Sequence, residues 1–187
     1  MTASVPCGVC LVVGGDGSGK TTLLRLLAGE LEAQAGTLQI NGVQLAGERL
    51  VYLQQVFWAD PRTTEHDQIT ALQYLALQRQ RYPGFLPADS ARLTQLVCGL
   101  SLVEHLEKPL YMLSTGSKRK VWLLAAFAAG AVVTLLDAPF SALDKASIAF
   151  VLRLLAGVAS DPTHSWVVAH HDVLDGLPLS QVIELAD

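Results

Sequence analysis

A glycine-rich run at residues 14–22 constrains this chain more than any other stretch. Its letters, GGDGSGKTT, fit the phosphate-binding pattern G-x-x-x-x-G-K-[ST] without a mismatch. An apolar run at residues 9–13 precedes it and a leucine-rich run at residues 23–29 follows it. The sequence therefore predicts a strand, a phosphate-binding loop and a helix in that order.

Each part of the run has a physical role in binding a polyphosphate. Glycines let the backbone curl close to the ligand, so that N–H groups and the positive end of the next helix face the negative oxygens. The ammonium of Lys20 adds a full positive charge, and the hydroxyl of Thr21 suits Mg²⁺, which prefers hard oxygen ligands. The expected phosphate-binding residues are Gly14, Gly15, Asp16, Gly17, Ser18, Gly19, Lys20, Thr21 and Thr22.

Size and composition limit the kinds of partner that this chain can be expected to bind. The 187 residues suffice for one sizeable core, and hydrophobic residues make up 51% of the chain, which favours large apolar contacts with other chains. The net charge of −4 argues against nucleic acid as the main partner, because such binders usually carry a basic face. We expect no signal peptide at the N-terminus.

Two local patterns have alternative interpretations. The uncharged run from Val121 to Leu136 has 16 residues, fewer than the roughly 20 that cross a bilayer, and Gly130 divides it. A buried helix followed by a central parallel strand is the better interpretation. Cys7 and Cys10 have the spacing of a redox or zinc pair, but the sequence has no second pair. We therefore expect Cys7 and Cys10 to be ordinary buried thiols in a reducing compartment, and Cys98 to be an ordinary thiol as well.

Strand and helix signals alternate along the chain, which predicts an α/β fold with a mostly parallel sheet flanked by helices. We expect helices over residues 20–31 and 144–157, and strands over residues 37–42, 49–53, 131–137, 165–169 and 181–185.

From about residue 57 the pattern changes to helices separated by prolines. One of these helices would carry its apolar side on Ile69, Leu72, Leu75 and Leu77. We expect a single domain, residues 1–187, with a helical subdomain at about 57–130. The aromatic residues Phe57 and Trp58 would be exposed and either pack internally or meet a partner.

Asp137 ends an apolar strand, residues 132–136. In open α/β sheets ligands bind at the carboxyl ends of the strands. Asp137 can therefore complete a magnesium shell together with Thr21, directly or through water.

Residues 113–117, LSTGS, resemble the LSGGQ-type signature of the ATP-binding cassette (ABC) family, and the surrounding motifs agree in order. Gln55, at the end of the strand predicted over residues 49–53 and before the helical insertion, resembles the glutamine of the family's Q-loop. The run DAPFSALD at residues 137–144 resembles its Walker B and D-loop segment, and His171 resembles its switch histidine. Together these ordered motifs are far more specific than any one of them.

The resemblance implies a P-loop NTPase fold whose helical insertion carries the signature loop. Two cassettes would join head to tail around two MgATP molecules, each held by Lys20, Thr21 and Asp137 of one chain. The other chain would cover it with Ser114, Thr115, Gly116 and Ser117. Gln55 would sense the metal as a catalytic and metal-binding residue, and His171 would be catalytic.

The resemblance also implies a partner. A separate transmembrane subunit would dock on the helical insertion, and the chain would be cytoplasmic, attached peripherally to the inner face of the membrane.

Three departures from the family pattern affect this expectation. Ala138 stands where the family has the glutamate that polarises the attacking water, and Ser117 stands where the signature usually has glutamine. The strand before the phosphate loop begins close to residue 1, so we expect the family's N-terminal strands, with their adenine-stacking aromatic, to be missing.

Two functions from different classes remain open. The first is the ATPase subunit of a membrane transporter, and the second is a regulatory or assembly cassette that binds ATP without useful hydrolysis. A small-molecule kinase is a third, distant alternative, since it would have no use for a signature loop and a switch histidine.

Overall fold

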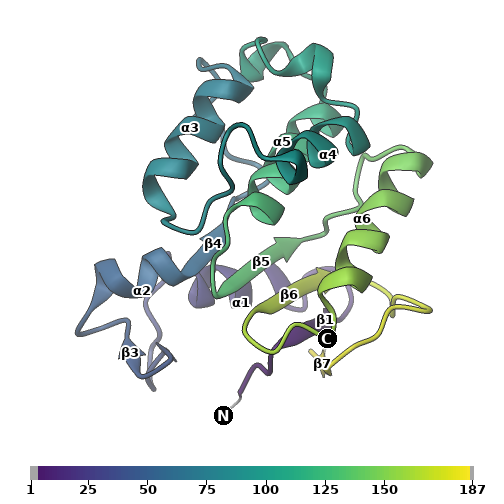
Figure 1. Cartoon of the computed structure of the whole chain (residues 1–187). Helices are drawn as coiled ribbons and strands as arrows, with labels where there is room; N and C mark the ends of the chain where they lie inside the picture. Colours follow the sequence, from purple (N-terminus) through teal and green to yellow (C-terminus); the bar gives the residue numbers. More distant parts are fainter. Residues whose placement is uncertain (1–3, 186–187) are drawn as a thin grey trace. The chain divides into compact units, whose positions relative to one another are not determined.

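The computed structural model describes residues 4–185 (Figure 1). The chain divides into two compact units. The first holds residues up to Trp58, the segment Ala131–Pro139 and residues from Leu154 onward. The second holds Ala59–Gly130 and Phe140–Arg153.

A five-stranded parallel sheet forms the centre of the first unit. Its strand order is β4-β5-β6-β1-β7, and every neighbouring pair is parallel. Both faces of the inner strands are covered, since all six residues of β1 are buried. This is why these strands are continuous apolar runs instead of alternating ones. The bounds are β1 Gly8–Val13, β4 Val56–Trp58, β5 Val133–Asp137, β6 Ser165–His170 and β7 Gln181–Glu184.

Two helices, a small hairpin and the end of a third helix, Leu154–Val158, also belong to this unit. Helix α1, Lys20–Leu27, packs across β5 and β6 (Figure 1). The two-residue strands β2, Gln39–Ile40, and β3, Val43–Gln44, form the hairpin, and helix α2, Arg49–Gln55, leads into β4. The buried core joins the two helices to the sheet through Val12, Leu24, Ala28, Tyr52, Val56, Leu135, Val167 and Ala169.

The predicted strand over residues 49–53 is wrong, because this segment belongs to helix α2. Arg49 and Tyr52 are three residues apart and lie on one helical face, from which both reach the end of α1. The Arg49 guanidinium donates to the Gly29 carbonyl at 2.6 Å, and the Tyr52 hydroxyl donates to the Leu27 carbonyl at 2.8 Å. The apolar residue Leu50, which suggested a strand, is 80% exposed.

The second unit is built from helices. Helices α3, Ala71–Arg81, and α4, Ala91–Gly99, both pack against α5, Thr115–Ala128, and helix α6, Lys145–Val158, begins here. Two single 3₁₀ turns, Val103–His105 and Leu110–Met112, connect α4 to α5. Each of the first three helices starts at a hydroxyl residue that caps its backbone N–H groups: Thr70, Ser90 and Ser114.

Two sequence predictions for residues 57–81 need correction. The buried face of α3 is formed by Ala71, Tyr74, Leu75 and Gln78, which follow the helical period. Leu72 and Leu77 are 45% and 44% exposed, and Ile69 precedes the helix. Phe57 and Trp58 belong to β4 of the sheet, where Phe57 is 1% exposed, so the internal alternative holds for Phe57.

Other predicted elements are confirmed to within about two residues: the strands over 131–137, 165–169 and 181–185 and the helix over 144–157. Helix α1 stops at Leu27 instead of residue 31, and the N–H groups of Gly29 and Glu30 then close a turn on carbonyls of the last helical turn. The run from Val121 to Leu136 divides into α5 and β5 as expected. Within residues 4–185, no helix combines the length and hydropathy needed to cross a membrane.

The cysteines are unpaired thiols, but only one is buried. Cys10 lies inside β1, whereas Cys7 and Cys98 are exposed. The expectation of a buried Cys7 is therefore wrong, because β1 begins only at Gly8.

Candidate functional site

The phosphate loop joins the end of β1 to the start of α1. Gly17 and Gly19 have φ angles of +86° and +93°, a left-handed conformation that glycine adopts without steric cost. The Lys20 ammonium donates to the carbonyls of Gly14 at 2.7 Å and Gly15 at 2.6 Å, so it lies over the loop. The loop therefore holds a cation beside the N-terminus of a helix, an arrangement that attracts anions.

Thr21 and Asp137 meet beside this loop. The Thr21 hydroxyl donates to a carboxylate oxygen of Asp137 at 2.7 Å, and both residues are half-buried. Thr21 is in the first turn of α1 and Asp137 is the last residue of β5. Two hard oxygens are thus held within hydrogen-bond distance, next to the position where a bound phosphate chain would run.

The register of the sheet explains this convergence. Val13 pairs with His170, and Asp137 pairs with Ala169, so β1, β5 and β6 end at the same edge. His171 follows directly at that edge. Its ring is 67% exposed, stacks on the His170 ring with centroids 4.1 Å apart, and lies 3.1 Å from the carboxylate of Asp172.

Gln55 does not lie at this edge. It is the last residue of α2 and precedes β4, so the expectation that it ends a strand is wrong. Val56 pairs with Val133, four residues before Asp137, which puts Gln55 roughly 16 Å from Asp137 along the strand direction. Its side chain instead donates to the Val51 carbonyl at 3.4 Å. This geometry does not support Gln55 as a metal ligand or a catalytic residue.

The segment that leaves the carboxyl end of β4 begins at Ala59, and its first glutamine is Gln68. No glutamine therefore follows β4 directly, where the family's Q-loop would place one. The sequence pattern does not reveal this, because it predicts the strand over residues 49–53, whereas β4 begins at Val56.

Ala138 follows Asp137 and has a left-handed backbone, with φ of +43°. Its N–H donates to the Ala169 carbonyl at 3.0 Å, which fixes the turn out of the sheet. The methyl side chain offers neither a proton acceptor nor a hydrogen-bonding group for water.

The signature loop lies in the second unit at the start of α5. The Ser114 hydroxyl oxygen accepts the Ser117 N–H at 3.1 Å, and the Ser114 hydroxyl donates to the Ser117 hydroxyl oxygen at 3.0 Å. Ser114 and Thr115 are exposed, while Gly116 is half-buried. A Cβ at Gly116 would lie 2.3 Å from the Ala142 carbonyl oxygen, so this position needs glycine for a contact within its own chain.

The residues present fit a magnesium-bound nucleotide. Among residues 4–185, no group of three or more His, Cys, Asp or Glu side chains forms a self-sufficient metal cage. Thr21 and Asp137 instead supply two oxygens, which suits Mg²⁺ because this ion usually keeps waters and shares phosphate oxygens. Lys20 and the N–H groups of the loop would supply the positive field for the phosphates.

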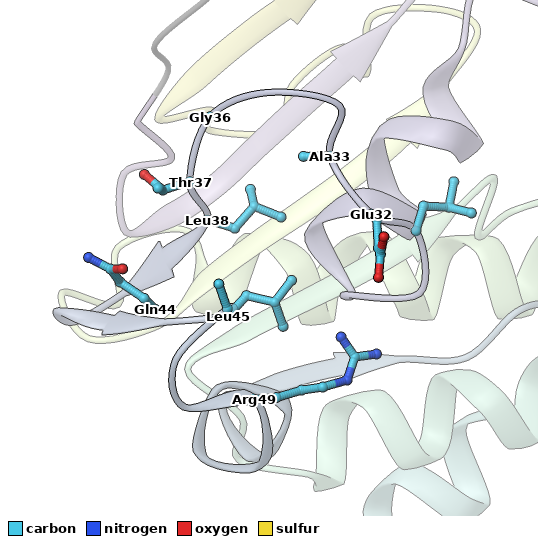
Figure 2. A pocket seen from close by; sticks show the side chains of 10 residues that line it. Glu32, Ala33, Gly36, Thr37, Leu38, Gln44, Leu45 and Arg49 are labelled. Carbon is cyan, nitrogen blue, oxygen red and sulfur yellow. The ribbon is translucent and has the colours of Figure 1, made fainter.

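A separate cavity of about 450 Å³ lies in the first unit beside the β2–β3 hairpin. Figure 2 shows Leu38 and Leu45 on one side and the ends of Glu32 and Arg49 extending toward each other. None of the predicted phosphate-binding or metal residues lines it. The cavity is therefore distinct from the phosphate loop.

Comparison with known proteins decides the family. The model of the family described as "ABC transporter" matches residues 3–141. The chain belongs to the ABC transporter family. It is 32% identical over 145 residues to the cytochrome c biogenesis ATP-binding export protein CcmA of Salmonella typhi, which covers 78% of this chain and 67% of the relative.

Solved structures of the ABC family share the fold. An ATP-binding protein of an ABC transporter from Pyrococcus furiosus superposes with a TM-score of 0.79 at 22% identity, covering 99% of this chain and 88% of that one. The ATP-binding cassette MJ0796, in a dimeric post-hydrolysis state bound to ADP and Pi, gives a TM-score of 0.72 at 20% identity, covering 92% and 78%. The chain is thus an ABC-type P-loop ATPase with an α/β fold.

Proposed function

We propose that this ABC protein is the ATP-binding subunit of a membrane transporter that acts in cytochrome c biogenesis export, as its CcmA relatives are named. The observation that carries the proposal is the contact of Thr21 with Asp137 beside the Lys20 ammonium. A nucleotide with its magnesium ion is the ligand that uses all three groups at once.

In this proposal each residue has a defined task. Lys20 binds the terminal phosphates and the loop N–H groups surround them, while the dipole of α1 favours the negative charge. Thr21 and Asp137 hold the magnesium ion, which neutralises charge on the phosphate oxygens. His171, exposed at the same edge, contacts the terminal phosphate or the water next to it.

A second cassette completes the site. The N-terminus of α5 carries Ser114 and Thr115 at the surface, so its N–H groups can meet an anion on another chain. The MJ0796 neighbour is a dimer bound to ADP and Pi, which agrees with pairing through nucleotide. The dimer of this chain, with itself or with a related cassette, would act on a separate membrane-embedded subunit from the cytoplasmic side.

A specific observation favours the alternative of an ATP-binding cassette that regulates or assembles a complex without useful hydrolysis. Ala138 cannot activate water, and no glutamine follows β4 directly. A chain without the family's glutamate and without this glutamine can still bind ATP through its phosphate loop. It lacks the positioned base, which typically contributes about 10²- to 10⁴-fold in rate.

The test combines sedimentation velocity and phosphate release on the full chain. We expect a monomer without nucleotide and a dimer at saturating MgATP, and a chain that stays monomeric would contradict the paired cassette. Steady-state phosphate release, measured alone and with a co-purified membrane subunit, separates the two functions. Turnover that the membrane subunit stimulates supports the transporter subunit, whereas association without turnover supports the regulatory cassette.

A further inference from the structure

Lys120 and Asp144 form a short ion pair within the second unit. The Lys120 ammonium donates to a carboxylate oxygen of Asp144 at 2.6 Å, and the lysine side chain is only 12% exposed. Asp144 also accepts from the N–H and the hydroxyl of Ser147, at 2.8 and 2.9 Å, at the start of α6. The hydrogen bond from Lys120 has the largest effect and those from Ser147 add to it, and together they hold the pKa of Asp144 well below its usual range.

A second contact joins the same two segments. Gly116 packs so closely against the Ala142 carbonyl that a Cβ would lie 2.3 Å from it. Gly116 and Lys120 are four residues apart and therefore lie on one face of α5. Ala142 and Asp144 both belong to the loop between β5 and α6.

We infer that Lys120 is a positioning residue, which holds the loop at residues 140–144 against the signature loop so that the signature N–H groups keep a fixed direction. Two contacts on one face of α5 hold this loop: the close packing of Gly116 against the Ala142 carbonyl and the ion pair of Lys120 with Asp144. Together they fix both the distance of the loop from the helix and its rotation. Capping of α6 alone would need only Ser147 and Asp144, so it does not explain a nearly buried lysine on another helix.

The inference rests on the proposed function in one respect, since the direction of the signature loop matters when a second chain presents nucleotide to it. Removal of the ion pair should therefore weaken association of the chains more than binding of nucleotide to the phosphate loop. Lys120 belongs to the second unit and the phosphate loop to the first, so its proposed action on dimerisation runs through Gly116 and Ser114 of its own unit.

The chain offers a matched control in Lys118. This residue lies on the same helix and forms an equally short ion pair, 2.6 Å, with Asp67 instead of the loop at 140–144. The experiment compares Lys120→Met, Lys120→Arg, Asp144→Asn and Lys118→Met. Asp144→Asn keeps an oxygen that can accept the Ser147 N–H, so the helix start is preserved.

We expect Lys120→Met and Asp144→Asn to weaken MgATP-driven dimerisation by about tenfold or more, and the double variant to add little further. The affinity of the monomer for nucleotide should stay within about twofold of the wild-type value. The Lys120→Arg variant keeps a positive charge that can pair with the Asp144 carboxylate, so it should dimerise like the wild type. Lys118→Met should leave dimerisation unchanged. Dimerisation of Lys120→Met at the wild-type level, or an equal loss in Lys118→Met, would overturn the inference.

Amide hydrogen exchange of the nucleotide-free chain separates this outcome from a failure of the proposed function. Lys120→Met should speed exchange in the segments 114–118 and 140–144, and Lys118→Met should not do so in the second segment. A wild-type chain that never dimerises would overturn the proposed function, while unchanged exchange in Lys120→Met would overturn the positioning role.

Discussion

The Thr21 hydroxyl donates to Asp137 at 2.7 Å, although 116 positions separate the two residues in the chain. The contact exists because β1 and β5 flank β6 and all three strands end at one edge of the sheet. The loop that follows β1 and the residue that ends β5 are thereby brought together.

This pair predicts a metal-specific effect of Asp137→Asn. The amide keeps the hydrogen bond from Thr21 but loses the negative charge that attracts Mg²⁺. We expect the affinity for MgATP to fall by about tenfold or more, while the affinity for ATP in EDTA changes by less than about threefold. Calorimetric titration with and without Mg²⁺ measures both values. Equal losses in the two titrations would show that Asp137 stabilises the loop instead of holding a metal.

Ala138→Glu should raise the rate of ATP hydrolysis by at least about tenfold with little change in ATP affinity. Ala138 already has a φ of +43°, so glutamate adds no backbone strain that alanine lacks. Ala138→Gln is the control of similar size without a basic oxygen. The measurement is phosphate release from a chain that dimerises on MgATP. A rate that Ala138→Glu leaves unmoved would favour the regulatory cassette.

Gly116→Ala should destabilise the chain even without nucleotide. The added methyl would meet the Ala142 carbonyl at 2.3 Å, a clash that costs about 1–3 kcal/mol. Gly157→Ala in α6 meets nothing within 4 Å and should instead stabilise by about 0.5–1 kcal/mol. Urea unfolding of both variants gives the free energies. A Gly116→Ala chain as stable as the wild type would contradict the close contact.

The thiols predict a pH-dependent labelling pattern. Burial raises the pKa of Cys10 to about 11, and it is inaccessible inside β1, whereas Cys7 and Cys98 are exposed. Because the thiolate is the reactive form, iodoacetamide at pH 8 should label Cys7 and Cys98 of the folded chain and reach Cys10 only after unfolding. The raised pKa of Cys10 also affects the free energy of unfolding, which should fall as the pH rises above the pKa of this thiol in the unfolded chain. In that pH range the unfolded chain releases the proton and the folded chain keeps it. Mass spectrometry that finds Cys10 labelled as fast as Cys98 would contradict this.

The sequence predicted the parallel sheet and the convergence of Lys20, Thr21 and Asp137 because each strand there is a continuous apolar run next to a motif of fixed spacing. It could not predict α2, because the hydrogen bonds of Arg49 and Tyr52 to the end of α1 decide that segment and are tertiary contacts. The prediction for Gln55 fails for the same reason, since Gln55 ends α2 and precedes β4. The pairing of Lys120 with Asp144 is not predictable from the sequence either, since only the fold brings these two charges together.

The N-cap position of α5 allows a probe of pairing that keeps the helix intact. Aspartate and asparagine cap as well as serine, so Ser114→Asp and Ser114→Asn both preserve α5. Only Ser114→Asp places a negative charge where a phosphate of the other chain would lie. We expect Ser114→Asp to abolish MgATP-driven dimerisation, as seen by sedimentation, and Ser114→Asn to retain it within about threefold. Equal behaviour of the two variants would argue against an anion at this loop.

The central claim, that one chain holds the nucleotide and the other covers it, is tested most directly by mixing two defective chains. Lys20→Ala cannot bind the phosphates and Ser114→Asp cannot cover them, so neither should dimerise alone with MgATP. An equimolar mixture contains one intact site, formed by Lys20 of the Ser114→Asp chain and Ser114 of the Lys20→Ala chain. Sedimentation equilibrium of the mixture should reveal a MgATP-dependent dimer, weaker than that of the wild type. A mixture that remains monomeric at concentrations where the wild type is fully dimeric would contradict the composite site.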